Sequence, residues 1–345
     1  MDNNKNLENA KIIAQYCLQY VPTIVIGSGY SAGYGYPTVK QLSQLLQDTI
    51  DLTGLNTNEL KQWSEFKELS KENGMEVALT KLGSIQPHLL ERIVITCWTH
   101  FITLDKLSIS NSIKNPTYQS LTRLLQYLFY SSNNSISIVT TNYDLLAEYA
   151  ISSGGFIATT GFLPGLIGTR ENTLPVKYHR GSTLARTANV WKVHGSIDWI
   201  QFDGTITRAL LQNLAPGVVP QIITPGIEKY QRTLREPFRS ILMGADNALT
   251  QSTAYLCIGY GFNDEHIQEK LVERVRRDSR PICIISKNLT EATISFIKTL
   301  KKDYLAIEEN GTGSKIYTHE LPNGFVIGEK QLWTLDGFLN WSIER

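Results

Sequence analysis

The sequence lacks an excess of charge of either sign. Its 33 lysine and arginine residues are offset by 32 aspartate and glutamate residues, which leaves a formal net charge of +1 at pH 7. Nucleic-acid-binding domains are usually strongly basic, so direct binding of nucleic acid is not predicted. Hydrophobic residues make up 42% of the chain and charged residues 19%, a balance typical of a globular protein with a sizeable core.

Cysteine is scarce, and its four positions lie far apart. Cys17, Cys97, Cys257 and Cys283 form no C-x-x-C pair, so the sequence predicts no zinc ribbon and no bound metal. Cys257 and Cys283 stand within apolar runs, which favours buried thiols over a framework of disulfides. Free thiols are typical of a reducing compartment.

Signals for export or membrane insertion are also missing. Residues 1–9 are polar and contain no apolar core of a signal peptide. A long uncharged stretch, residues 149–169, contains five glycines and is predicted to be a loop rather than a membrane span. We therefore expect a soluble, cytoplasmic protein.

Short apolar runs alternate with stretches of helical periodicity through most of the chain. The predicted strands are residues 21–26, 135–139, 190–193, 221–224, 254–259 and 281–286. The predicted helices are residues 6–20, 38–50, 144–151, 236–250, 264–277 and 331–343. This alternation predicts an α/β fold, Rossmann-like, in which a mainly parallel sheet carries helices on both faces. Near the C-terminus, Asn310-Gly311 and Asn323-Gly324 indicate turns or hairpins.

Residues 51–131 differ from the rest because they contain no strand-like run. Helical periodicity is found at residues 60–71, 75–82, 89–103 and 118–130. We therefore predict two parts: a Rossmann-like domain formed by residues 1–50 and 132–345, and a helical insertion or cap formed by residues 51–131. The insertion is our candidate for a gate or an interface.

The first predicted strand is followed directly by Gly27-Ser28-Gly29. Glycine at this position lets the backbone approach a diphosphate, and the N-terminus of the next helix supplies a positive dipole end. The spacing departs from the G-x-G-x-x-G pattern. By itself, the turn supports nucleotide binding and a purely structural role equally.

Two further polar segments follow predicted strands, Thr140-Thr141-Asn142-Tyr143-Asp144 and Lys192-Val193-His194-Gly195-Ser196. Ligands of α/β sheets bind at the carboxyl ends of the strands, so the three segments can converge on one crevice. The amide of Asn142 can both donate and accept hydrogen bonds, and a histidine can exchange a proton near neutral pH. The structural alternatives are a helix cap for Asn142 and a packed or surface position for His194.

Taken together, these segments resemble the motifs of sirtuins. Residues 27–31 with 35–37 resemble the opening motif, residues 141–144 the asparagine motif, and residues 194–196 the catalytic histidine motif. Pro225-Gly226 and residues 258–264 resemble later cofactor-facing segments of prokaryotic sirtuin-like domains.

The sequence differs from deacylating sirtuins in two respects. The two C-x-x-C pairs of their zinc module are missing, and Pro37 is followed by Thr38, Val39 and Lys40 instead of the usual acidic, aromatic and basic residues. The chain instead resembles the zinc-less sirtuin-like NAD⁺ hydrolases of bacterial anti-phage defence. The resemblance implies NAD⁺ as substrate, depletion of cellular NAD⁺, a homo-oligomer and, for some members, a HerA-type ATPase partner.

The resemblance also implies residue roles. Asn142 would position the ribose or a water, and His194 would act as general base. The implied cofactor-binding residues are Gly27, Ser28, Gly29, Tyr30, Ser31, Asp144, Gly195, Ser196, Gly259, Gly261 and Asn263. An NAD-dependent transferase of ADP-ribosyl or acyl groups and a nucleotide-sensing scaffold without turnover are the alternatives.

Overall fold

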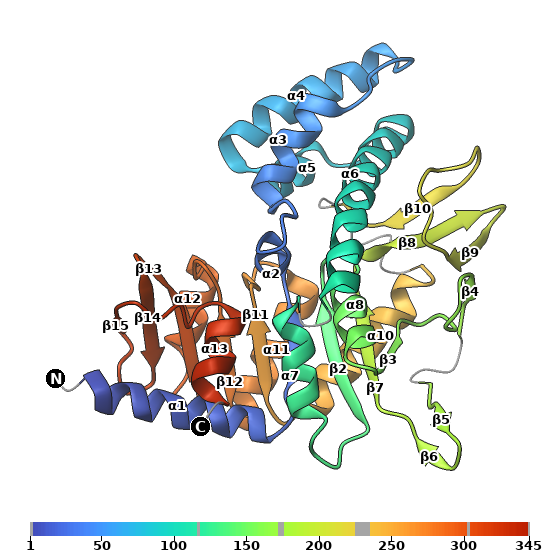
Figure 1. Cartoon of the computed structure of the whole chain (residues 1–345). Coiled ribbons are helices and arrows are strands. Elements are labelled where there is room, and N and C mark those ends of the chain that lie inside the picture. Colours follow the sequence, from blue (N-terminus) through green and yellow to red (C-terminus); the bar gives the residue numbers. More distant parts are fainter. Residues whose placement is uncertain (1–2, 116–117, 172–175, 225–234, 302–303, 344–345) are drawn as a thin grey trace.

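A long twisted sheet runs through the centre of the molecule (Figure 1). The computed structural model describes residues 3–115, 118–171, 176–224, 235–301 and 304–343. Within these residues, nine strands form the sheet. Their spatial order is β15 (Phe325–Ile327), β14 (Gly313–Thr318), β13 (Tyr304–Asn310), β12 (Ile282–Ile285), β11 (Tyr255–Ile258), β1 (Thr23–Ile26), β2 (Ser135–Thr140), β7 (Thr187–Lys192) and β3 (Ile157–Thr159).

All strand pairs from β13 to β3 are parallel, which confirms the predicted mainly parallel sheet. At the other end, β13 and β14 form the hairpin indicated by Asn310-Gly311, and β15 adds a second antiparallel pair. Gly311 adopts a φ of +57°, the left-handed conformation that a tight hairpin turn requires.

The direction of chain progression reverses at β1. From β1 the chain moves to β2 and β7 on one side, and it later returns to place β11, β12 and β13 on the other side. The connection that leaves β1 therefore leads towards the β2 side of the sheet, and the connection that leaves the neighbouring strand β11 leads towards the β12 side. Such a topological switch point opens a crevice at the carboxyl ends of the strands.

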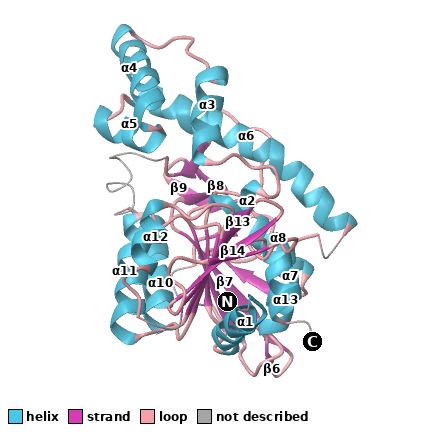
Figure 2. Cartoon of the chain, turned by 90° about the vertical axis from the view of Figure 1, so that its left-hand side faces the viewer, coloured by secondary structure: helices cyan, strands magenta, loops and turns pink. Residues whose placement is uncertain are grey.

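Helices cover both faces of the sheet (Figure 2). One face carries α10 (Phe238–Gln251), α11 (Glu265–Asp278) and α12 (Glu291–Ile297), and the other carries α1 (Asn3–Gln19), α7 (Ser120–Leu128), α8 (Leu146–Ser153) and α13 (Leu335–Ser342). Successive strand residues point to opposite faces, so Ile24 and Ile26 join one core cluster while Val25 joins the other. Burial on both faces explains why these strands are continuous apolar runs.

The described elements between residues 51 and 115 are α4 (Thr57–Asn73), α5 (Met75–Leu82) and α6 (Pro87–Lys114). Together with α3 (Val39–Thr49), helices α4 and α5 lie beyond the carboxyl ends of the strands (Figure 1). Helix α6 is longer than the predicted 89–103, because its continuation buries polar residues such as Asp105 and Ser108, which break the apolar periodicity. Helix α7 packs against α8 and α13. The division of the chain into two domains remains a prediction.

A second, antiparallel sheet was not predicted. Its order is β10 (Val219–Ile222), β8 (Gly195–Phe202), β9 (Thr205–Arg208) and β4 (Gly168–Thr169). The run predicted at 221–224 therefore belongs to this sheet and not to the parallel one. The missed signal is Asp203-Gly204 between β8 and β9, where both residues have positive φ, as a type I′ hairpin turn requires.

The prediction of a loop over residues 149–169 was wrong in part. Helix α8 continues to Ser153, and β3 and β4 lie within the stretch. Its glycines obscured these short elements. The residues 179–184 form a small hairpin of β5 (His179–Arg180) and β6 (Thr183–Leu184).

The four cysteines are buried and unbonded, as the apolar context of Cys257 and Cys283 predicted. Within the described ranges, no helix combines the length and the apolar character needed to cross a membrane.

Candidate functional site

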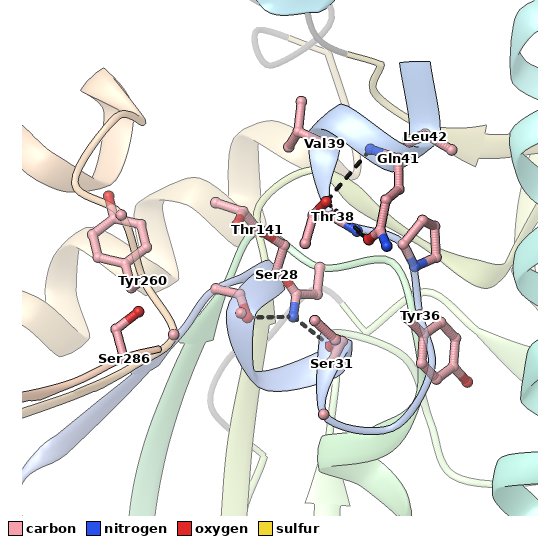
Figure 3. A pocket seen from close by; sticks show the side chains of 18 of the residues that line it. Ser28, Ser31, Tyr36, Thr38, Val39, Gln41, Leu42, Thr141, Tyr260 and Ser286 are labelled. Atoms are coloured by element: carbon pink, nitrogen blue, oxygen red, sulfur yellow. Dashed lines mark hydrogen bonds between the residues drawn. The ribbon is translucent and has the colours of Figure 1, made fainter. Parts of the chain in front are cut away.

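A cavity of about 940 Å³ lies at the carboxyl ends of β1, β2, β7, β11 and β12 (Figure 3). This volume is at the upper end of the range of small-molecule sites. The residues that follow these strands line it, so it occupies the crevice of the switch point between β1 and β11. Figure 3 shows Ser31, Thr141 and Tyr260 at this cavity; they belong to the connections that follow β1, β2 and β11.

The structure brings most of the predicted site residues together. Those that line the cavity are Asn142, His194, Gly27, Ser28, Gly29, Ser31, Asp144, Gly259, Gly261 and Asn263. Tyr30, Gly195 and Ser196 do not line it. Pro225 and Gly226 lie outside the described residues.

Asn142 is held in place by its own side chain. Its Nδ2 donates to the carbonyl oxygen of Gly27 at 3.0 Å and to Oγ of Ser31 at 2.8 Å. Its backbone N–H donates to Oγ1 of Thr140, the last residue of β2. Both amide protons are therefore committed inside the protein. The Asn142 amide therefore has no proton left to donate to a ligand, although the sequence allowed such a bond. Its Oδ1 can still accept a hydrogen bond from a ligand.

Ser31 and Asp144 extend this arrangement into a chain of hydrogen bonds. Oγ of Ser31 donates to Oδ2 of Asp144 at 2.7 Å, and Oδ1 of Asp144 accepts from the backbone N–H of Leu146 at 3.1 Å. The Asp144 carboxylate thus fixes the direction of the Ser31 hydroxyl, and the hydroxyl oxygen then accepts from Asn142. Because the Ser31 hydroxyl donates its only proton to Asp144, its oxygen can only accept, and the Asn142 side chain must therefore present its NH₂ group to Ser31.

His194 lies in the connection between β7 and β8, with its Nε2 3.1 Å from Oδ2 of Asp264. Asp264 precedes α11 and also lines the cavity. Asp264 belongs to the segment 258–264 that resembles a cofactor-facing segment, but the resemblance implies no role for this residue. A carboxylate at the carboxyl end of a predicted strand was the signal that would have found it.

The glycines of the opening motif are explained by backbone packing. The N–H of Gly29 donates to the carbonyl oxygen of Gly259 at 3.0 Å. A Cβ on Gly27 would lie 2.5 Å from that same oxygen, and a Cβ on Gly259 would lie 2.2 Å from the backbone nitrogen of Tyr30. A short helix, α2 (Ser28–Ala32), begins directly after Gly27, where the sequence predicted a glycine-rich turn. The glycines therefore let the β1 and β11 connections touch at the floor of the cavity.

The three residues away from the cavity have structural roles. The Tyr30 hydroxyl donates to Oε1 of Gln119 at 2.8 Å, and burial raises the pKa of Tyr30. Gly195 has a φ of +86°, and a Cβ there would lie 2.1 Å from the carbonyl oxygen of Gln221. Ser196 is fully buried in β8. Gly195 and Ser196 therefore build the turn that holds His194.

The N-terminus of α3 faces the cavity. Thr38 caps the helix, and its side chain and that of Gln41 satisfy each other's backbone N–H groups. Thr38, Val39 and Lys40 line the cavity, and Figure 3 shows Thr38 and Gln41 at the start of this helix. The positive end of the helix dipole and the Lys40 ammonium create a favourable environment for an anion. Thr38, Val39 and Lys40 are also the residues at which the sequence departs from the sirtuin pattern, so the resemblance does not predict their place at the cavity.

Ser286, Lys287 and Asn288 also line the cavity, as does Trp333 from the segment before α13. The first three follow β12, which was predicted as a strand, so the rule that ligands gather at strand carboxyl ends was sufficient to find them. No comparable signal marks Trp333, which tertiary packing brings to the cavity. Among the described residues, no group of three or more His, Cys, Asp or Glu could hold a metal ion.

A buried carboxylate lies beside the site. Asp105 of α6 accepts hydrogen bonds from the hydroxyls of Tyr36 at 3.3 Å and Tyr149 at 2.5 Å. Burial, the largest cause, and the negative charge of Asp144 raise the pKa of Asp105 to about 7, although the Tyr149 hydrogen bond and the positive charge of Lys192 oppose them. Tyr36 lines the cavity, so Asp105 anchors part of its wall to α6.

The chain is similar to solved structures of Sir2 homologues. Similar solved structures include a Sir2 homologue mutant in complex with ADP-ribose, with 13% identity, coverage of 80% of this chain and 86% of that chain, and a TM-score of 0.45. A Sir2 homologue–NAD complex has 13% identity, coverage of 82% of each chain and a TM-score of 0.37. No curated protein matches the chain. Residues 136–304, from β2 to the start of β13, match the family model of the SIR2-like domain.

Proposed function

We propose that this protein hydrolyses NAD⁺ at the bond between nicotinamide and ribose, producing nicotinamide and ADP-ribose. The observation that carries the proposal is the presence of Asn142 and His194 on one cavity of about 940 Å³ at the switch point of the sheet. The amide oxygen of Asn142 can accept a hydrogen bond from a ribose hydroxyl or a water, and the imidazole of His194 can take a proton. The match of residues 136–304 to the SIR2-like domain supports the same substrate.

The chemistry follows from the charges that develop. Nicotinamide leaves as a neutral base, so it needs no proton, and positive charge develops on the ribose at the carbon it leaves. Water supplies the oxygen that bonds to this carbon, and one water proton must be removed. His194 takes that proton directly or through a ribose hydroxyl, and Oδ1 of Asn142 accepts a hydrogen bond from the water or the hydroxyl. A general base of this kind contributes about 10²–10⁴-fold to the rate.

The diphosphate is assigned to the N-terminal end of α3. Lys40 and the first residues of this helix line the cavity, and they combine a positive side chain with the positive end of a helix dipole. This arrangement leaves the region of Asn142 and His194 to the nicotinamide ribose.

The cellular role belongs to the same proposal. The resemblance of the motifs to zinc-less NAD⁺ hydrolases favours a cytoplasmic, NAD⁺-depleting effector of bacterial anti-phage defence. It also favours a homo-oligomer, with a HerA-type ATPase as a candidate partner. The helical segment 51–131 is the proposed gate or interface of that assembly.

The decisive experiment measures NAD⁺ consumption by the purified protein, with nicotinamide and ADP-ribose separated by chromatography. We expect both products in equal amounts from the wild type, and at least about 100-fold slower turnover from His194→Ala and from Asn142→Ala. The exposed His319 supplies the matched control, and His319→Ala should retain wild-type turnover. Nicotinamide release with ADP-ribose attached to protein would instead establish a transferase. Tight NAD⁺ binding without turnover would contradict the proposal and favour a sensor.

A further inference from the structure

The carboxylate of Asp264 and the imidazole of His194 meet inside the protein. Oδ2 of Asp264 lies 3.1 Å from Nε2 of His194, and the two side chains are only 9% and 10% exposed. His194 comes from the β7–β8 connection, whereas Asp264 comes from the connection between β11 and α11. The contact therefore joins two connections that leave the sheet on either side of its switch point.

Both partners are held by the backbone around them. The carbonyl oxygen of His194 accepts from the N–H of Ile223 at 2.8 Å. The carbonyl oxygen of Asp264 accepts from the N–H of Gln268 at 2.8 Å and from the hydroxyl of Tyr260 at 3.3 Å. The carboxylate is therefore presented to the imidazole from a fixed position.

The connection before Asp264 also contains an unfavourable backbone conformation. Phe262 has a φ of +55°, in the left-handed region that side chains other than glycine disfavour by about 1–2 kcal/mol. Its ring is fully buried and stacks on Phe296 at 5.0 Å, which offsets this cost through packing. Strained conformations of this kind are common where a site requires a side chain in a particular place.

We propose that Asp264 is a positioning residue for His194. It keeps the ring proton on Nε2 and leaves the lone pair of Nδ1 to accept the proton from the water or the ribose hydroxyl. Nε2 is the enclosed nitrogen, and a neutral imidazole carries its proton on one nitrogen and its acceptor lone pair on the other. The negative carboxylate also stabilises the imidazolium that forms after the proton is taken. This inference rests on the proposed NAD⁺ hydrolysis.

In the structure, the N–H direction of Nε2 is not aligned with Oδ2 for a hydrogen bond, although the two atoms are within 3.1 Å. The proposed hydrogen bond therefore requires the imidazole to rotate until the two are aligned. Catalytic hydrogen bonds commonly tighten in this way when the substrate binds.

The pairing can be tested without turnover by nitrogen NMR of protein labelled with ¹⁵N-histidine, with the His194 signals identified by their loss in His194→Gln. We expect the neutral wild type to carry the His194 proton on Nε2. Asp264→Asn should increase the population with the proton on Nδ1, because the asparagine amide can donate to Nε2. A wild-type proton on Nδ1, or an Asp264→Asn spectrum identical to the wild type, would overturn the proposal.

Kinetics then separate positioning from folding. Asp264→Asn should lower kcat on the order of 100-fold while the Kd for NAD⁺ changes less than about 3-fold, and Asp264→Glu should recover part of the loss. Asp203→Asn removes one exposed carboxylate outside the cavity and should behave as the wild type. Unchanged kcat in Asp264→Asn would refute the positioning role and leave the proposed function intact. An inactive wild type would refute the function, and the NMR measurement would still decide the pairing.

Discussion

The ammonium of Lys192 lies 3.3 Å from the carboxylate of Glu148, and the two side chains are only 1% and 5% exposed. Lys192 also donates to the carbonyl oxygen of Asp144, whose carboxylate orients Ser31. Burial raises the pKa of Glu148, and the charge of Lys192 opposes this shift. The ion pair thus ties the strand that leads to His194 to the helix that follows the asparagine motif.

Lys192→Met should lower the free energy of unfolding by about 3–5 kcal/mol, because it leaves the Glu148 carboxylate buried without a compensating charge. Equilibrium unfolding in urea measures the loss. Lys192→Met combined with Glu148→Gln removes both charges and should be more stable than the single variant. Equal losses in the single and double variants would show that the ion pair is not the cause.

Gly259→Ala should lower the free energy of unfolding by more than about 2 kcal/mol and weaken NAD⁺ binding. Gly259 has a φ of +58°, and its new Cβ would lie 2.2 Å from the backbone nitrogen of Tyr30, so the β1 and β11 connections must separate. Gly328→Ala is the control, because a Cβ there meets nothing within 4 Å. Thermal unfolding and NAD⁺ titration measure the two effects, and equal behaviour of the two variants would contradict the packing explanation.

Ser31→Ala should reduce turnover of NAD⁺ by about 10- to 100-fold with a smaller change in Kd, because the Asn142 amide loses one of its two side-chain anchors. Steady-state kinetics and NAD⁺ titration separate the two quantities. Ser152→Ala, at an exposed position on α8, should leave both unchanged. Loss of binding with unchanged kcat would show that Ser31 contacts the substrate instead of orienting Asn142.

Asp105→Asn should remove a pH dependence of stability. The folded-state pKa of Asp105 is about 7, above the ordinary value of about 4, so between these pH values the unfolded chain releases a proton that the folded protein keeps. Wild-type stability should therefore fall as the pH rises through this window, by up to about 4 kcal/mol at roughly 1.4 kcal/mol per pKa unit, and then level off.

The measurement is urea unfolding of wild type and Asp105→Asn at pH 5.5 and pH 8. The variant should gain stability relative to the wild type as the pH rises, because asparagine cannot ionise. Asp203→Asn, which changes an exposed carboxylate, provides the comparison. A stability difference that is the same at both pH values would mean that Asp105 does not titrate in this window.

Much of the fold could be predicted because its signals are local. The strands β1, β2, β11 and β12 are short apolar runs, and the α3 and α11 helices have clear periodicity. The turn at Asn310-Gly311 depends on two neighbouring residues. The rule that ligands gather at strand carboxyl ends then located Asn142 and His194, because both directly follow strands of the parallel sheet.

The tertiary structure decided what each of these residues can do. The sequence places Asn142 after a strand, but only the contacts with Gly27 and Ser31 show that its amide protons are already used. Likewise, β8, β9, β10, α10 and β11 separate His194 from Asp264 in the sequence. The two side chains meet because the parallel sheet brings the carboxyl ends of β7 and β11 to the same end of the molecule. Local sequence specifies backbone conformation over a few residues, whereas proton positions and buried charges depend on neighbours that only the assembled sheet brings together.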